Sequence, residues 1–200
     1  MNPQTWWYMS RASGIVAWIV LAATCLWGIL LITRMLKPAD RPAWLLDLHR
    51  WLGALSIVTT GVHLLTLVAD NYVHFGWKEI FVPNGSAWKT GPVTWGVFAF
   101  YLLIVIEVSS LMMKKLPRRL WHGIHLMSYL LFAIATVHGI AAGSDHGNII
   151  FLLSTSGVCS VVLFAFVARV LQGRAKRIAK AERSAGTPAE TRQRASSTSM

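Results

Sequence analysis

The feature that most constrains this chain is a series of five long apolar segments within only 200 residues. A helix needs about 20 apolar residues to cross a hydrocarbon core of roughly 30 Å. Each segment must be helical, because only a helix satisfies its own backbone polar groups within one span. The segments are residues 14–33, 51–69, 92–113, 121–142 and 149–171. The sequence therefore predicts an all-α integral membrane protein, a five-span transmembrane helix bundle.

Composition agrees with a membrane class. The chain is 54% hydrophobic and 14% charged, whereas soluble domains carry about 25% charged residues. After Gly173 the apolar pattern ends and Arg, Ala, Ser and Thr dominate. We therefore expect a transmembrane bundle over residues 1–173 and a disordered basic cytoplasmic tail over 174–200.

The basic residues indicate an orientation. Of the 19 lysines and arginines, 16 lie in the first and third connections and at the C-terminal end, and the other three are Arg11, Lys78 and Lys89. The positive-inside rule then predicts a multi-pass protein of the cell membrane with its N-terminus outside and its C-terminus in the cytoplasm. Topology accounts for the net charge of +11, so nucleic acid is not expected as a partner, and the lipid bilayer is.

The long outer connection, residues 70–91, contains several aromatic residues. We expect it to form a short helix lying on the membrane. Pro83, Asn84 and Gly85 would supply a turn, because these residue types favour turn conformations.

Histidines inside the spans suggest a chemistry. His49 and His63 belong to the second span, and His125 and His138 belong to the fourth. Ionisable residues within spans are rare and usually functional, and neutral imidazole is a standard ligand of heme iron. The second and fourth spans run parallel, so His49 shares the cytoplasmic leaflet with His125, and His63 shares the outer leaflet with His138. The pattern predicts two non-covalent b-type hemes, because no C-x-x-C-H motif for covalent attachment is present.

Helix geometry fits the second span better than the fourth. His49 and His63 are 14 residues apart, which is about 21 Å along the axis and about 40° around it. His125 and His138 are 13 residues apart, which leaves about 140° between them in an ideal helix. His122 in place of His125 gives about 160°. The fourth helix must kink or twist, or the hemes must approach it from different sides, and geometry leaves His122 and His125 as alternatives.

Charged residues near the histidines each have more than one interpretation. Arg50, Arg118 and Arg119 would neutralise the propionates of the inner heme, or they are topology determinants in water. Glu107, toward the cytoplasmic end of the third span, snorkels, pairs with a nearby base or relays protons, and we favour the first two.

Small and aromatic residues near the histidines also have two interpretations. Gly53, Gly61 and Gly139 would let a porphyrin approach the backbone, or they serve ordinary helix packing. Phe132 would lie between the hemes, although its default role is packing.

Three motifs carry a resemblance to a known family. They are L-D-L-H-R-W-L-G at His49, G-V-H-L-L at His63, and R-R-L-W-H-G-I-H-L-M-S-Y followed by T-V-H-G-I at His138. Over residues 9–147 the chain resembles the ferric reductase-like transmembrane domain, which ferric reductases, NADPH oxidases and the heme subunit of bacterial methionine-sulfoxide repair systems share. The family separates its ligand pairs by 14 and 13 residues, so the resemblance favours His125 over His122.

The resemblance implies electron flow from a cytosolic flavin toward the outer face. Many relatives have six spans, and larger ones continue into FAD- and NADPH-binding domains. Here five spans are predicted, and nothing resembles G-x-G-x-x-G. We therefore expect FAD or NADPH only through a partner, with a separate flavoprotein or a quinol as donor. The chain would be the membrane component of an oxidoreductase, and the sequence does not decide whether it is itself an enzyme.

Three functions remain in view. The leading hypothesis is transmembrane electron transfer from the His49/His125 heme to the His63/His138 heme, with a ferric chelate, dioxygen or a partner protein as the outer acceptor. The second is a cytochrome b membrane anchor of a dehydrogenase complex that exchanges electrons with quinone. The third is a heme-free transporter or sensor that uses the histidines for protons or a metal.

Overall fold

The computed structural model describes residues 4–35, 41–70, 75–145 and 147–197, with side chains through residue 183. Within these ranges the protein is helical, and no strand is found. The helices are α1 (Gln4–Thr33), α2 (Pro42–Ala69), α3 (Trp77–Phe81), α4 (Thr90–Leu111), α5 (Arg118–Leu126), α6 (Ser128–Ala142) and α7 (Ile149–Ser197).

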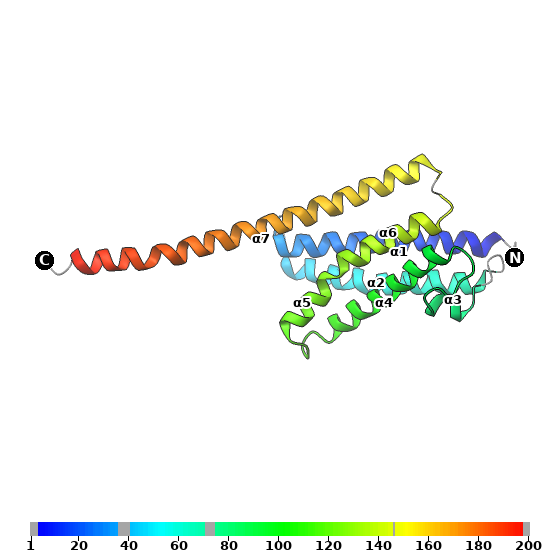
Figure 1. Ribbon diagram of the computed structural model, residues 1–200, viewed down its shortest axis with the longest axis horizontal. Helices are drawn as coiled ribbons and strands as arrows, with labels where there is room; N and C mark the ends of the chain where they lie inside the picture. The colour runs from blue at the N-terminus through cyan, green and yellow to red at the C-terminus, as the bar shows by residue number, and fades with distance from the viewer. Residues whose placement is uncertain (1–3, 36–40, 71–74, 146, 198–200) are drawn as a thin grey trace.

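Five helical segments are long and apolar enough to cross a membrane, which confirms the predicted fold class. They are α1, α2, α4, α5 together with α6, and α7. In Figure 1, α1 and α2 lie side by side, α4 and α6 cross them on one side, and α7 leaves the bundle as one long helix. The helix α2 packs on α1, while α6 packs on α4 and α1. The helices that carry the predicted ligands, α2 in the second span and α5 and α6 in the fourth, are therefore separated by a space that α1 and α4 border.

The second span begins earlier than hydropathy predicts. The helix α2 starts at Pro42 rather than near residue 51, and a proline is well tolerated in the first turn because its missing N–H has no intrahelical partner there. His49 consequently lies two turns inside the helix and is fixed by it, not at a loosely held end.

The fourth span is interrupted at Met127. The Met127 N–H donates to the carbonyl of Ile124, three residues earlier, at 3.0 Å, whereas an α-helical bond spans four residues. The α-helical pattern resumes in α6, where the Leu131 N–H donates to the carbonyl of Met127 at 2.8 Å. The interruption lies between His125 and His138, so the angle expected from an ideal helix does not apply. A kink was one of the solutions that the helix geometry predicted.

The outer connection contains the short helix α3, as the sequence predicts. The turn that follows places Asn84 at φ 61°, a left-handed conformation that Asn tolerates. The Asn84 backbone N–H donates to the Thr94 hydroxyl at 2.9 Å, and that hydroxyl donates to the Asn84 side chain at 3.0 Å. These bonds tie the connection to the first turn of α4.

The core lies between α1, α4, α6 and α7. Its members are buried apolar residues, among them Leu21, Leu103, Leu131 and Val162. Phe132 is buried in this core and stacks on Trp18, with ring centroids 5.8 Å apart. Phe132 is therefore a packing residue at the level between the two pairs of histidines.

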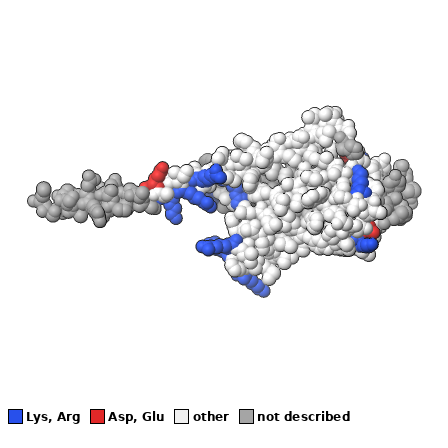
Figure 2. All heavy atoms as spheres, viewed as in Figure 1, with Lys and Arg blue, Asp and Glu red and all other residues white. Residues whose placement is uncertain are grey.

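Charge separates the two ends of the bundle. Figure 2 shows Lys and Arg gathered at the end that carries α5 and along the helix α7 beyond it, with a broad uncharged surface between this end and the few charges near the N-terminus. The helical backbone of α7 continues through the basic segment to Ser197. The domain boundary after Gly173 and the disorder of the tail remain predictions.

Candidate functional site

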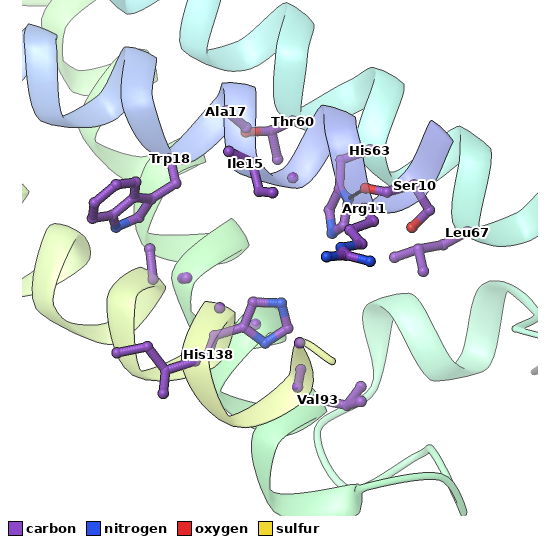
Figure 3. A pocket seen from close by; sticks show the side chains of 18 of the residues that line it. Ser10, Arg11, Ile15, Ala17, Trp18, Thr60, His63, Leu67, Val93 and His138 are labelled. Carbon is purple, nitrogen blue, oxygen red and sulfur yellow. Dashed lines mark hydrogen bonds between the residues drawn. The ribbon is translucent and has the colours of Figure 1, made fainter. Parts of the chain in front are cut away.

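His63 of α2 and His138 of α6 face each other across a cavity of about 440 Å³. Figure 3 shows the two rings pointing toward one another from opposite walls, with Trp18 farther along the same space. The lining is mostly apolar, and a volume of this size lies within the range of about 300–1,000 Å³ that is typical of ligand pockets. The outer pair of the sequence analysis is thus brought together around a space that a ligand can enter.

Each imidazole of the outer pair is held by a backbone carbonyl of another helix. The Nδ1 atom of His63 lies 2.9 Å from the carbonyl oxygen of Ser10, and that of His138 lies 2.8 Å from the carbonyl oxygen of Pro92. A carbonyl only accepts, so each Nδ1 must carry the hydrogen and each Nε2 keeps its lone pair. This tautomer is the one that a metal-binding histidine needs.

The inner pair consists of His49 of α2 and His125 of α5. Their ring centroids are 5.8 Å apart with an interplanar angle of 78°. His125 stacks on Trp121 at 5.3 Å and 24°, and its Nδ1 lies 3.3 Å from the hydroxyl oxygen of Ser110. The structure therefore pairs the histidines by leaflet, His49 with His125 and His63 with His138.

The Nδ1 atom of His49 is buried and has no hydrogen-bond partner within the described part of the chain. The Thr24 carbonyl acts on this ring but does not meet the geometry of a hydrogen bond. His49 is thus less firmly held than the two outer imidazoles.

The alternative ligand His122 is exposed, and its ring centroid lies 5.9 Å from that of Trp121. His74 and His146 lie outside the described residues. The ligand roles of His49, His125, His63 and His138 remain predictions.

The glycines in contact with the histidine rings are not those the sequence singled out, although Gly139 lines the outer cavity. A Cβ atom on Gly61 or Gly139 would meet nothing within 4 Å, and one on Gly53 would lie 2.9 Å from the Glu107 carboxylate. The histidines instead lie against glycines of α1 and α4. A Cβ atom would come within 3.0 Å of His63 at Gly14, 3.2 Å of His49 at Gly28 and 2.6 Å of His138 at Gly96.

Glu107 packs against the backbone of α2 at Gly53, one turn beyond His49. It forms no ion pair with any residue that the structure describes, so the expected pairing with a base is not found there. Snorkelling and proton relay stay open for this carboxylate.

The three predicted propionate contacts are surface residues. Arg50 is exposed and pairs with Asp47 at 3.4 Å, and Arg118 and Arg119 are exposed at the start of α5. Their contact with propionates remains a prediction.

Sequence reasoning missed two other arginines. Arg11 lines the outer cavity and forms an ion pair with Asp145. Arg169 of α7 donates to the Tyr129 hydroxyl and lies over that ring at 5.6 Å, four residues along the chain from His125. Both lie near the ends of spans, where a basic residue ordinarily indicates topology alone.

The donor sets fit a heme better than a metal held by protein alone. Among the described residues no group of three or more His, Cys, Asp or Glu side chains gathers to hold a metal, whereas a structural zinc takes four such ligands. Each pair offers two imidazoles, and a porphyrin needs only axial ligands because it supplies the remaining nitrogens itself. The apolar outer cavity agrees with a macrocycle.

The arrangement defines a class: an integral membrane helix bundle with two pairs of neighbouring imidazoles, separated along its second and fourth spans. The family model of the ferric reductase like transmembrane component matches residues 13–136, more than half of the chain, so the protein belongs to this family. The match includes His49, His63 and His125 and ends two residues before His138. No curated protein and no solved structure matches the chain. Family membership supports a membrane electron-transfer role, and domains of this family generally bind heme.

Proposed function

We propose that this protein carries electrons across the membrane by means of two b-type hemes, one held by His49 and His125 and the other by His63 and His138. The main support is the outer pair, in which two imidazoles with fixed tautomers face each other across an apolar cavity. A heme bound by two histidines supplies reversible one-electron chemistry without releasing an intermediate.

At the outer site the chain's own groups orient the two imidazoles and exclude water from the cavity. The carbonyls of Ser10 and Pro92 accept from the imidazoles of His63 and His138, which aims each Nε2 lone pair into the cavity. The apolar walls keep water out and lower the local dielectric. These residues thus prepare two axial ligands before any cofactor arrives.

At the inner site, side chains rather than backbone carbonyls orient the imidazole of His125. Trp121 supports the face of the His125 ring, and the Ser110 hydroxyl is its nearest polar contact. Arg50, Arg118 and Arg119 lie at this end of the bundle, where we propose that they bind the propionates. Along α2 the two sites are separated by about 21 Å, which spans much of the hydrocarbon core.

Electrons enter at the cytoplasmic site and leave at the outer face. The distribution of 16 of 19 basic residues supports a cell-membrane protein with its N-terminus outside and its C-terminus in the cytoplasm. A separate flavoprotein or a quinol is the donor, and an outer acceptor takes the electrons.

The experiment is an optical spectrum of the full chain purified after expression with adequate heme. We expect a reduced-minus-oxidised difference of a six-coordinate b-type heme and two hemes per chain. A colourless protein would contradict the proposal and favour a heme-free transporter or sensor. Two hemes together with a soluble outer-face dehydrogenase that copurifies would favour the cytochrome b anchor instead.

A further inference from the structure

Three imidazoles lie against the same local feature of a neighbouring helix. His63 contacts Gly14 and the carbonyl of Ser10, four residues earlier on α1. His138 contacts Gly96 and the carbonyl of Pro92, again four residues earlier, on α4. Gly28 of α1 likewise borders the His49 ring, and the carbonyl four residues earlier is that of Thr24, but the Nδ1 atom of His49 has no hydrogen-bond partner in the described part of the chain.

Helix geometry explains the spacing of four. A helical carbonyl already accepts from the N–H four residues later, and its second lone pair is free for another donor. The side chain of that later residue lies beside the carbonyl, because residues four apart share one face. A Cβ atom there obstructs an incoming ring, and glycine removes the obstruction.

The obstruction would be severe at Gly96 and milder at Gly14 and Gly28. A Cβ atom would lie 2.6 Å from the His138 ring at Gly96, 3.0 Å from the His63 ring at Gly14 and 3.2 Å from the His49 ring at Gly28. The nearest atom is Cε1 in each case, which lies between the two ring nitrogens. A displaced ring therefore changes the Nδ1 hydrogen bond and the direction of Nε2 together.

We propose that Gly14, Gly28 and Gly96 are positioning residues for the axial ligands. Each sets the direction in which Nε2 points, and Gly14 and Gly96 also set the strength of the bond between Nδ1 and a helical carbonyl, a bond that His49 lacks in the described part of the chain. This inference rests on the proposed function and deepens it. It assigns ligand control to α1 and α4, two helices that carry no ligand themselves.

The chain supplies a matched control variant. Gly61 lies in the second span, two residues before His63; it is not among the residues that line the outer cavity, and a Cβ atom there meets nothing within 4 Å. Gly61→Ala thus repeats the chemical change and its effect on helix propensity without touching a ring.

The experiment is a redox titration of the full chain in lipid nanodiscs, with His63→Ala used to assign the outer heme. A weaker bond at Nδ1 makes the imidazole less basic, stabilises the ferric state less, and raises the midpoint potential. We expect Gly96→Ala to favour reduction of the outer heme about tenfold, or about 59 mV for one electron. Gly14→Ala should shift the same heme less, Gly28→Ala should shift only the inner heme, and Gly61→Ala should leave both potentials unchanged.

The inference is overturned when the midpoint potentials and low-spin heme spectra of the Gly14, Gly28 and Gly96 variants match those of Gly61→Ala. Shifts at the wrong heme would overturn it equally. If Gly96→Ala does not accumulate in the membrane, Gly14→Ala decides the matter, because its contact is 3.0 Å rather than 2.6 Å. An unaltered protein without heme contradicts the proposed function, whereas two hemes with unresponsive glycine variants contradict only this inference.

Discussion

The outer and inner pairs of histidines are held in different ways. Both outer imidazoles lie within 2.9 Å of backbone carbonyls of α1 and α4. In the inner pair, His49 has no hydrogen-bond partner in the described part of the chain, and His125 has a hydroxyl at 3.3 Å. The outer ligands are therefore oriented by helix backbone, which no substitution removes, and the inner ligands by side chains.

This difference has an electrostatic consequence. A strong bond from Nδ1 to a carbonyl makes an imidazole more basic and favours a ferric ion at the outer site. Near the inner site Arg169 donates to the hydroxyl of Tyr129, four residues after His125, and its positive charge favours an added electron there. We therefore expect the carbonyl bonds to lower the outer midpoint potential and the charge of Arg169 to raise the inner one, and the predictions below test this comparison in order of effect.

The largest effect is expected from removing ligands. His63→Ala and His138→Ala should each abolish the same heme and about half of the reduced-heme absorbance, because one axial ligand cannot hold the cofactor in a six-coordinate state. His49→Ala and His125→Ala should abolish the other half.

Heme content per chain and difference spectra measure this. The double variant of His63 and His138 should equal either single variant. A further loss in that double variant would show that the two histidines serve different hemes.

A smaller effect is expected from Arg169→Gln, which removes a charge and keeps a hydrogen-bonding side chain. The inner midpoint potential should fall, because a cation no longer stabilises the added electron. The free energy of reduction should become less favourable by on the order of 1 kcal/mol, which is about fivefold in the reduction equilibrium. Spectroelectrochemistry measures the shift, and Tyr129→Phe is the control for the lost contact with the Tyr129 hydroxyl. An unchanged inner potential, or an equal shift at the outer heme, would refute the assigned role.

Ser110→Ala should act on the inner heme more weakly still. The hydroxyl lies 3.3 Å from His125 Nδ1, a long contact that contributes well under about 1 kcal/mol. The inner potential should change by less than it does in Arg169→Gln, with the outer potential constant. A larger change than in Arg169→Gln would reverse this ranking and point to the hydroxyl as the main control of the inner ligand.

The smallest effect is expected from His122→Ala. Its side chain is exposed, whereas the ring of His125 lies 5.8 Å from that of His49, so heme content should equal that of the unaltered protein and both potentials should change less than in Ser110→Ala. Loss of the inner heme in this variant, with retention in His125→Ala, would transfer the ligand role from His125 to His122.

The spans and the pairing by leaflet could be predicted from the sequence for simple reasons. An apolar run of sufficient length indicates a span regardless of which helices pack against it. The second and fourth spans are separated by one span, so they run in the same direction. His49 and His63, 14 residues apart on one regular helix, followed directly from this argument. The family resemblance is likewise confirmed by the match over residues 13–136.

The surroundings of the ligands could not be predicted, because they depend on which helices touch. Gly14 and Gly96 are far from their histidines in sequence, and one sequence does not reveal that α1 and α4 supply the carbonyls. The interruption at Met127 has no proline or glycine to mark it at that position. Arg169 resembles any other basic residue at the end of a span.

The central claim is that each pair of imidazoles, one near each membrane face, binds a porphyrin from opposite sides. An experimental density map of the pigmented protein in nanodiscs tests this most directly. The account predicts one planar density between His63 and His138 and a second between His49 and His125, each joined to both rings. A map in which either pair is bridged by no such density, or in which the planar densities contact other side chains instead, would contradict it.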